Sequence, residues 1–352
     1  MAADPAKFEQ FMEKMVGDMG AAISAALVTL GDRLGLYKAL AQGGPASPAE
    51  LAQRSGCAER YLREWLAAQA AAGYVTFDKG SGRYSLDEAQ RQAFAAEGNP
   101  GFMPGFFQVL ASMFRDEPKI AEAFRSGRGV GWHEHDVALF HGTERFFRPN
   151  YAAHLVADWI PALEGVRVKL EQGANVADVG CGHGSSTLIL AKAFPRSRFF
   201  GFDYHGPSIE RARELAQAEG LADRVTFETA AAKSYPGRNY DLVTFFDCLH
   251  DMGDPAGAAA HVRRSLEKDG TWMVVEPFAN DRTEDNLNPV GRIFYAASTM
   301  ICTPASLSQE VGLGLGAQAG EKRLTEVIKA GGFTRVRRAA ETHFNMVLEA
   351  RP

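Results

Sequence analysis

Three glycines that follow a short apolar run are the first candidates for chemistry. In the sequence VADVGCGHGSST, residues 176–187, Gly180, Gly182 and Gly184 alternate with other residues, and Asp178 comes directly before them. Glycine tolerates positive φ and lets another molecule approach the backbone closely. This segment therefore predicts a tight turn between a strand and a helix, although a glycine pattern alone occurs at many turns without a ligand.

An acid at the end of the next predicted strand indicates that the glycine turn belongs to a ligand-binding site. Asp203 lies about 20 residues beyond the turn, where a carboxylate can hydrogen-bond ribose hydroxyls. A dinucleotide needs the spacing GxGxxG for its pyrophosphate, whereas this chain has GxGxG beside Asp178. That carboxylate would repel pyrophosphate but suits the ammonium group of an amino-acid cofactor, so the pattern favours S-adenosylmethionine (SAM) over NAD. Further cofactor contacts are expected from Cys181, Tyr204, Ala230, Ala231 and Asp247.

A histidine and an aspartate, His250 and Asp251, follow the predicted strand 240–246. Ligands bind beyond the carboxyl ends of parallel strands, so this pair should face the reactive end of the cofactor. Methyl transfer chiefly requires alignment of the acceptor, and an acceptor hydroxyl must also lose a proton, which a histidine accepts well near neutral pH. The sequence is equally compatible with a histidine that caps the following helix.

Alternating strands and helices position these residues. From about residue 166 the pattern is typical of an α/β domain with a parallel sheet. Strands are expected at 176–179, 198–203, 225–228, 240–246 and 270–275, and helices at 187–194, 208–219 and 256–266. Two last segments, 333–339 and 344–350, are expected to finish the sheet as an antiparallel pair.

The first 90 residues have a different pattern. A helix over 22–40 carries leucines spaced along one face, and Ser47, Pro48 and Glu50 have the spacing of a capping box that begins a second helix. A third helix over 58–72 precedes a hairpin of 74–77 and 83–85, which together predict a winged helix. We therefore expect three regions: a winged-helix, dimerisation-type domain over 1–90, a helical connector and substrate lid over 91–165, and a cofactor-binding domain over 166–352.

Composition excludes several classes of protein. The 352 residues carry a formal net charge of −5, whereas nucleic-acid-binding domains are usually basic. The four cysteines are widely spaced, which favours reduced thiols over a disulfide framework or a zinc site, and no metal is expected. No run of about 18 uninterrupted apolar residues is present, so we expect a cytoplasmic protein with no membrane contact.

The glycine turn and its partner acid resemble a known family. Val176 to Gly184 resembles motif I of class I SAM-dependent methyltransferases, and Asp203 resembles the ribose-binding acid of motif II. The resemblance implies a Rossmann-like seven-stranded sheet with an antiparallel last strand. Where the family often has an acid near adenine, this chain has Ala230 and Ala231, which implies backbone and apolar contacts to the base.

The segment DLVTFFDCLHD, residues 241–251, is similar to plant-type small-molecule O-methyltransferases. In that family the histidine of the HD pair is the general base and a glutamate at the end of the next strand orients it, which implies these roles for His250 and Glu276. The chain departs from the family pattern at Phe246 and Met252, where a lysine and a tryptophan are usual. Over its whole length the chain resembles bacterial winged-helix methyltransferases, one of them mycobacterial.

Two further segments are candidates for binding the methyl acceptor. Trp132, His133 and His135 lie in the sequence GWHEHD, which could form a pocket wall or an ordinary helix terminus. A long connection over 280–319 follows the fifth strand, and long connections of this kind often act as lids. Asn286, Arg292 and Tyr295 in this connection are the expected acceptor contacts, and packing between subunits is the alternative.

Three functions remain open from the sequence. The first is methyl transfer from SAM to a hydroxyl or thiol of a small molecule, with a small thiol as an acceptor that needs no strong base. The second is a winged-helix DNA-binding regulator that senses SAM, which the neutral charge of residues 1–85 disfavours. The third is a SAM-binding protein without turnover. A homodimer through the first domain is expected.

Overall fold

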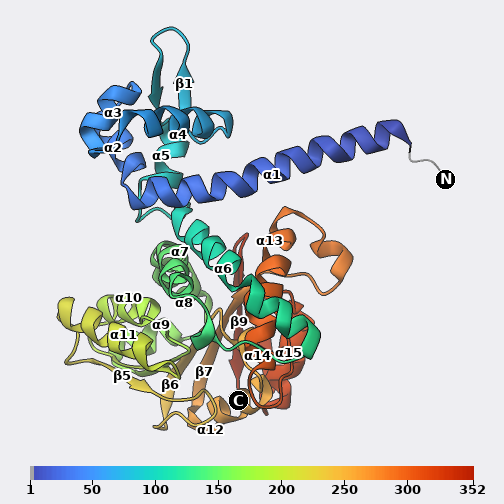
Figure 1. Cartoon of the computed structure of the whole chain (residues 1–352). Helices are drawn as coiled ribbons and strands as arrows, with labels where there is room; N and C mark the ends of the chain where they lie inside the picture. Colours follow the sequence, from blue (N-terminus) through green and yellow to red (C-terminus); the bar gives the residue numbers. More distant parts are fainter. Residues whose placement is uncertain (1–3) are drawn as a thin grey trace. The chain divides into compact units, whose positions relative to one another are not determined.

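The computed structural model describes residues 4–352, and the chain divides into two compact units (Figure 1). Unit 1 contains the residues up to Phe114 together with Val137–Asn150, and unit 2 contains Arg115–Asp136 and Tyr151–Pro352. The region 91–165 is therefore divided between the two units. Its separate existence as a connector, and the boundary at residue 166, stay predictions.

Unit 1 begins with a helical bundle and a small hairpin. Its elements are α1 (Pro5–Arg33), α2 (Leu36–Gly43), α3 (Pro48–Ser55), α4 (Glu59–Ala71), β1 (Thr76–Asp78), β2 (Arg83–Ser85) and α5 (Glu88–Phe94). Two further helices follow in the chain, α6 (Pro104–Ser126) and α7 (Ala138–His154), and each has residues in both units. The core contains Tyr37, whose ring stacks on Phe94 at 4.8 Å between centroids and meets Trp65 edge-on at 5.1 Å. The predicted winged-helix order of three helices and a hairpin is present.

The first helix differs from the expectation for residues 22–40. It begins at Pro5, because Asp4 caps it by accepting a hydrogen bond from the backbone N–H of Ala6 and proline suits the first turn. It ends at Arg33, because Gly35 adopts φ 68°, a conformation that favours glycine. The leucine spacing continues across this break, so the sequence pattern did not reveal it.

The capping box that begins α3 is present as predicted. The Ser47 hydroxyl accepts the backbone N–H of Glu50, and the Glu50 carboxylate accepts the backbone N–H of Ser47 at 2.7 Å. Two N–H groups that the helix itself cannot pair are thus satisfied.

Unit 2 is built on a seven-stranded sheet with the order β5-β4-β3-β6-β7-β9-β8. Its strands are β3 (Asn175–Val179), β4 (Arg198–Asp203), β5 (Val225–Thr229), β6 (Tyr240–Phe246), β7 (Leu266–Pro277), β8 (Arg335–Glu341) and β9 (Asn345–Arg351). The first five strands run parallel, and β9 runs antiparallel to both β7 and β8. The expected α/β sheet with its antiparallel finish is confirmed.

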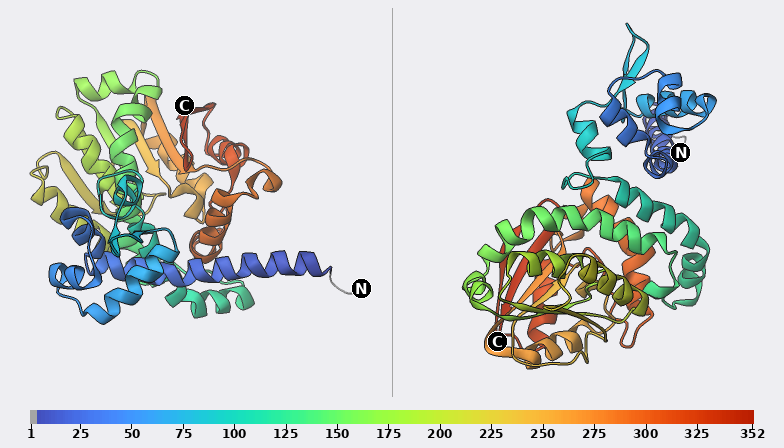
Figure 2. Two further views of the ribbon diagram at one scale, coloured as in Figure 1. Left: turned by 90° about the horizontal axis from the view of Figure 1, so that it is seen from above. Right: turned by 90° about the vertical axis from the view of Figure 1, so that its left-hand side faces the viewer.

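Helices lie on both faces of this sheet (Figure 2). The helices that follow α7 in the chain are α8 (Ile160–Ala162), α9 (Val166–Gln172), α10 (Ser185–Ala193), α11 (Gly206–Ala218), α12 (Pro255–Ser265), α13 (Pro289–Ala297), α14 (Thr303–Leu307) and α15 (Gly320–Ala330). Short helical turns lie between the longer elements: η1 (Trp132–Glu134), η2 (Leu155–Trp159), η3 (Leu249–Asp251), η4 (Thr283–Asn286) and η5 (Ser298–Cys302). Because β3 is next to both β4 and β6, the loops after these three strands meet at one edge of the sheet.

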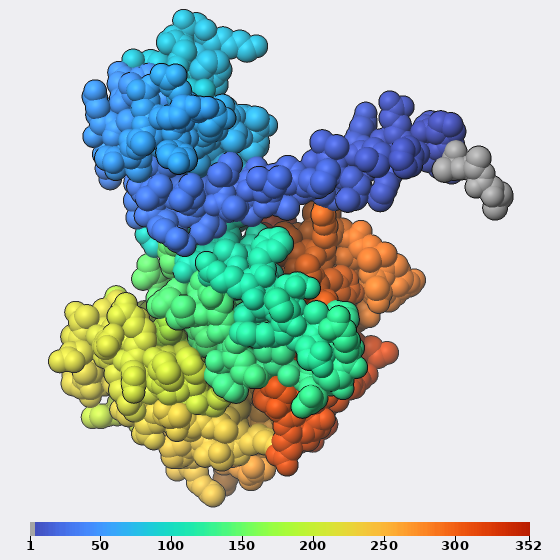
Figure 3. Space-filling view, viewed as in Figure 1, coloured from blue at the N-terminus to red at the C-terminus, as the bar shows by residue number. Residues whose placement is uncertain are grey.

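The first half of α1 stands clear of the rest of its own unit (Figure 3). Its apolar side chains are exposed: Phe8, Phe11, Met12, Val16, Met19 and Ile23. Among residues 4–352, α1 is the one helix that is long and apolar enough to cross a membrane. A helix near the amino terminus that meets this criterion is not by itself evidence of a membrane span, since helices of other kinds also meet it.

Replacing Ser47 with alanine is expected to lower the free energy of unfolding by about 1 kcal/mol, because the N–H of Glu50 loses its acceptor. Ser47→Asp keeps an acceptor and should stay close to the original protein. Urea denaturation followed by circular dichroism measures both. Equal stability of the alanine and aspartate variants would contradict this account of the helix start.

Candidate active site

The turn after β3 requires its glycines. Gly180, Gly182 and Gly184 have φ values of 73°, 52° and 79°, where other residues are strained. A Cβ at Gly184 would also lie 2.5 Å from the Phe227 ring, and one at Gly180 would lie 2.7 Å from the Cys248 sulfur. The backbone is therefore bent tightly just before α10 begins at Ser185, as the sequence predicts.

Asp178, directly before the turn, accepts three hydrogen bonds from side chains. Its carboxylate accepts hydrogen bonds from Ser186 at 2.7 Å, Thr187 at 2.5 Å and Thr244 at 3.0 Å. Burial raises the pKa of this carboxyl, although the three hydroxyl donors oppose the shift. Asp178 thus fastens the turn to α10 and β6, and its expected contact with a cofactor ammonium group stays a prediction.

Asp203 lies at the carboxyl end of β4, beside the glycine turn. Its two oxygens accept the backbone N–H groups of Gly182 at 3.0 Å and His205 at 2.9 Å. Burial raises its pKa, while these two N–H donors lower it. The carboxylate is half-buried, so it remains partly open at the edge of the sheet where a ribose is expected.

The other expected cofactor contacts surround the same edge. Tyr204 follows Asp203 and is 47% exposed, whereas Cys181 is buried within the turn and burial raises the pKa of its thiol. Ala230 donates its backbone N–H to the carbonyl of Asp203 at 2.9 Å, and Ala231 is exposed next to it. The ends of β3, β4 and β5 therefore present these residues together.

His250 is held by the glutamate of the neighbouring strand. Its Nδ1 lies 2.5 Å from an oxygen of Glu276, whose other oxygen accepts the backbone N–H of Leu249 at 2.9 Å. His250 and Glu276 are 4% and 1% exposed. The register of β6 and β7 explains this contact, because Phe246 pairs with Val275 and so brings η3 beside Glu276.

Asp251 approaches the other nitrogen of the same histidine. Its Oδ1 lies 3.1 Å from His250 Nε2, and its Oδ2 accepts the indole N–H of Trp132 at 2.9 Å. Burial alone would lower the pKa of His250, but the charges of Asp251 and Glu276 outweigh it and raise the pKa well above its ordinary value. A histidine between two carboxylates is oriented at both nitrogens and is a strong proton acceptor once it is neutral.

Asp247 is held in a conformation that few residues adopt. Its φ is 50°, and its carboxylate accepts hydrogen bonds from Tyr151 at 2.6 Å and Asn345 at 2.7 Å. Non-glycine residues with such backbone angles gather at functional sites. Burial raises the pKa of Asp247 to about 7, and the charge of Glu276 adds to this shift. Its place just before η3 puts it at the same edge as His250.

The segment predicted to contact the acceptor divides between two roles. Trp132 binds Asp251, and the ring of His133 meets that of Tyr204 edge-on at 6.3 Å between centroids. His135 instead turns its Nδ1 to Asp116 at 2.9 Å and is buried. The structure thus brings Trp132 and His133 to the site, while His135 packs behind them.

The long connection reaches the site through residues that the sequence did not single out. Gln309 donates to the backbone carbonyl of Asp251 at 2.9 Å, and Ser306 donates to that of Met252 at 2.8 Å. Cys302 at the end of η5 lies close to His250 and Asp251. Single residues of these types occur throughout the sequence, so nothing in it singled out Gln309, Ser306 or Cys302.

The three residues of this connection that the sequence favoured are placed elsewhere. Asn286 is buried and its amide hydrogen-bonds the backbone N–H and carbonyl of Asn280, both at 2.8 Å, which closes a loop. Arg292 is exposed and Tyr295 is half-buried on α13. Their contact with an acceptor stays a prediction.

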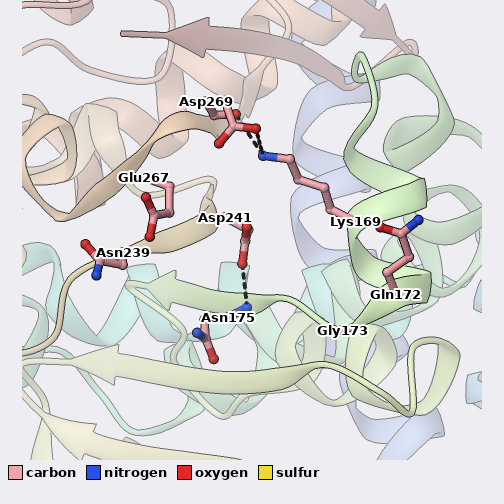
Figure 4. A pocket seen from close by; sticks show the side chains of 8 residues that line it. All are labelled: Lys169, Gln172, Gly173, Asn175, Asn239, Asp241, Glu267 and Asp269. Carbon is pink, nitrogen blue, oxygen red and sulfur yellow. Dashed lines mark hydrogen bonds and ion pairs between the residues drawn. The ribbon is translucent and has the colours of Figure 1, made fainter.

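A separate hollow lies at the amino ends of β3 and β6 (Figure 4). Its lining is polar: Lys169, Gln172, Gly173, Asn175, Asn239, Asp241, Glu267 and Asp269. Lys169 pairs with Asp269 at 2.6 Å, and Asp241 accepts the backbone N–H of Asn175 at 2.9 Å. Because cofactors of parallel sheets bind at the carboxyl ends, this hollow is on the wrong edge for the reaction.

Comparisons with known proteins agree with this geometry. A family model described as a methyltransferase domain matches residues 170–332, and one described as an Rv2258c-like winged HTH domain matches residues 21–95. The chain thus joins a winged-helix domain to a methyltransferase domain of the class that uses SAM, and the predicted fold, family resemblance and cofactor are confirmed.

Curated relatives align with part of the chain. A 2-methyl-6-phytyl-1,4-hydroquinone methyltransferase of Synechocystis is 31% identical over 199 residues, which cover 52% of this chain and 59% of the relative. A trans-aconitate 2-methyltransferase of Paracidovorax citrulli is 39% identical over 111 residues, which cover 32% and 42%. Across eight of the curated relatives, the chain spans between 6% and 59% of the relative's length.

Solved structures share the fold over the whole chain. Human N-acetylserotonin methyltransferase, determined in complex with SAM, has a TM-score of 0.71 at 15% identity and covers 99% of this chain and 98% of its own. An O-methyltransferase family protein from Burkholderia thailandensis has a TM-score of 0.70 at 15% identity, with 100% and 99% covered. Both likenesses concern the fold.

The raised pKa of Asp247 predicts a pH-dependent stability. Between the ordinary carboxyl value and about 7, the folded chain binds more protons at Asp247 than the unfolded chain does, so this residue destabilises the fold increasingly as pH rises through that interval. Asp247→Asn should therefore raise the melting temperature more at pH 8 than at pH 5. Asp223→Asn, at an exposed carboxylate, is the matched control. Parallel melting curves across this range would refute the assignment.

Proposed function

We propose that this chain transfers a methyl group from SAM to a hydroxyl group of a small molecule, with His250 as the general base. The observation that carries the proposal is the buried contact between His250 Nδ1 and Glu276 at 2.5 Å, next to the glycine turn. A carboxylate on Nδ1 fixes the tautomer in which Nε2 accepts a proton once the histidine is neutral, and it stabilises the imidazolium that forms.

The residues at the carboxyl ends of β3, β4 and β5 fit the cofactor. A Cβ at Gly180 or Gly184 would collide with Cys248 or Phe227, whereas one at Gly182 would meet no described atom within 4 Å. The space beside Gly182 supports close approach of a ligand to the backbone at that point. Asp203 would hold the ribose hydroxyls, and Ala230 and Ala231 would flank the adenine. When bound, SAM supplies an activated methyl group, so the protein chiefly has to align the acceptor and exclude water.

Three residues around His250 support its role as base. Glu276 orients the ring, while Asp251 faces Nε2 and is itself held by Trp132. An acceptor hydroxyl would bind beside Asp251 and give its proton to Nε2. Burial of His250, Asp251 and Glu276 keeps bulk water away from the proton transfer.

A thiol acceptor is the second candidate for the same site. A thiol has a pKa near ~8.5, so a fraction is already ionised near neutral pH and needs little help from a base. The buried pair of His250 and Glu276 favours the hydroxyl, because a thiol would not require it.

DNA binding is less well supported by the charges of unit 1. On α4, the third helix of the winged-helix domain, Arg60 pairs with Glu64 and Arg63 pairs with Glu59, both at 2.6 Å. A helix that reads DNA needs basic groups available for phosphates. Each of these two arginines is paired with an acid, which leaves less positive charge for DNA.

A second copy of this chain is the partner we propose for α1. Phe8, Met12, Met15, Met19 and Ala22 are spaced alternately by four and three residues, which is typical of helices that pair with another helix. Most of this stripe is exposed, so a homodimer would cover it.

Replacement of His250 tests the chemistry. His250→Gln is expected to reduce methyl transfer to a hydroxyl acceptor by about 100-fold or more, because the base is lost, while affinity for SAM measured by calorimetry stays within about twofold. Radiolabelled SAM and a panel of phenols, alcohols and thiols, with products identified by mass, provide the assay. The matched control is His343→Ala at an exposed position. Undiminished transfer to a hydroxyl in the His250 variant would rule out this base.

Replacement of Met19 tests the dimer. Met19→Lys places a charge within the α1 stripe and should shift the chain from dimer to monomer in light scattering coupled to size-exclusion chromatography. Gln10→Lys adds the same charge on the opposite face of α1 and should leave the dimer intact. A monomeric original protein at all concentrations would contradict the dimer.

A further inference from the structure

Three potential metal ligands lie close together, and one of them is the proposed base. One ligand atom each from His250, Asp251 and Cys302 lies within 4.8 Å of the other two. The three residues are 4%, 7% and 7% exposed. His250 and Asp251 belong to η3, whereas Cys302 comes from η5 in the long connection, so the tertiary fold assembles this group from two distant segments.

The group has the donors that zinc prefers. An imidazole nitrogen, a carboxylate oxygen and a thiolate sulfur bind Zn²⁺ at about 2.0–2.3 Å in a tetrahedral arrangement. The donors around such an ion lie roughly 3–4 Å apart, which follows from those bond lengths. Side-chain rotations would bring the three atoms to this spacing. A thiolate disfavours Mg²⁺ and Ca²⁺, which prefer oxygen ligands.

The surrounding contacts are those of a metal site rather than of a chance cluster. Histidines that bind metals usually donate their other ring N–H to a carboxylate, and His250 Nδ1 already contacts Glu276 at 2.5 Å. The ring therefore presents Nε2 to Asp251 and Cys302. Asp251 is oriented in the same way, because the Trp132 indole binds its Oδ2.

A buried atom of Asp251 points to a ligand independently. Its Oδ1 is inaccessible to solvent, and its contact with His250 Nε2 at 3.1 Å is an ion pair without hydrogen-bond geometry. Buried carboxylate oxygens are normally hydrogen-bonded. A cation between Oδ1, Nε2 and the Cys302 sulfur would satisfy all three atoms at once.

We propose that His250, Asp251 and Cys302 form a binding site for a soft divalent cation such as Zn²⁺, with one coordination position left open. Binding displaces the protons of the Cys302 thiol and of Nε2 into the solvent. Since the metal takes the nitrogen that the proposed function requires, the bound ion inhibits methyl transfer; this second part alone rests on the proposed function. The sequence predicted no metal, because its four cysteines are widely spaced.

Metal binding is measured on the full-length, reduced, chelator-treated chain. Titration with Zn²⁺ against a chromophoric chelator should show one tight site per chain, and Cys302→Ser should weaken it at least tenfold. Cys57→Ser, which removes a thiol of unit 1, is the matched control and should not change the affinity. Equal affinity of the original protein and the Cys302 variant would overturn the site.

Cobalt provides a second readout that does not depend on activity. Co²⁺ bound to the original protein should give a thiolate-to-cobalt charge-transfer band, which should disappear in Cys302→Ser and persist in Cys57→Ser. If the cobalt spectrum of the original protein lacks this band, the cation has no sulfur ligand. This result does not depend on whether the Cys302 variant folds correctly.

Inhibition separates this inference from the proposed function. Zn²⁺ should inhibit methyl transfer by the original protein at concentrations at least tenfold lower than those that inhibit Cys302→Ser. Tight zinc binding without inhibition would contradict the blocking of Nε2, and a chain that binds zinc but transfers no methyl group would contradict the proposed function and leave the metal site standing.

Discussion

The buried carboxylate of Asp178 is the constraint on which the site depends. It joins three parts of unit 2, because its hydrogen-bond donors lie at the start of α10 and on β6. The glycine turn is therefore fixed between two rigid elements instead of being a free loop. Since β6 also carries η3 at its end, the position of His250 relative to the turn follows from the same contact.

A second buried carboxylate holds the proposed base in place. Glu276 on β7 holds both the ring of His250 and the backbone of Leu249. Neighbouring strands of the sheet thus carry different proposed roles. The ends of β3, β4 and β5 present the proposed cofactor-binding surface, and the ends of β6 and β7 present the proposed base. These groups lie close together because neighbouring parallel strands end at the same edge of the sheet.

Local patterns explain how much of this could be predicted. The strands were recognisable from apolar runs, and the glycine turn from its spacing, because backbone requirements there are local. His250 was recognisable from its place after a predicted strand, whereas the role of Glu276 came from resemblance to a family. The contact of Trp132 with Asp251 joins residues 119 apart, and that of Cys302 with His250 depends on how the long connection folds, so no local signal revealed them. The break at Gly35 was hidden by a continuous leucine pattern.

A structure of the chain with S-adenosylhomocysteine tests the central claim most directly. The account predicts the molecule at the carboxyl edge of the sheet, with its ribose hydroxyls on Asp203 and its sulfur on the side of His250. The position of the sulfur relative to Nε2 decides the role of the histidine. Binding at the polar hollow on the opposite edge, or no binding at all, would contradict the account.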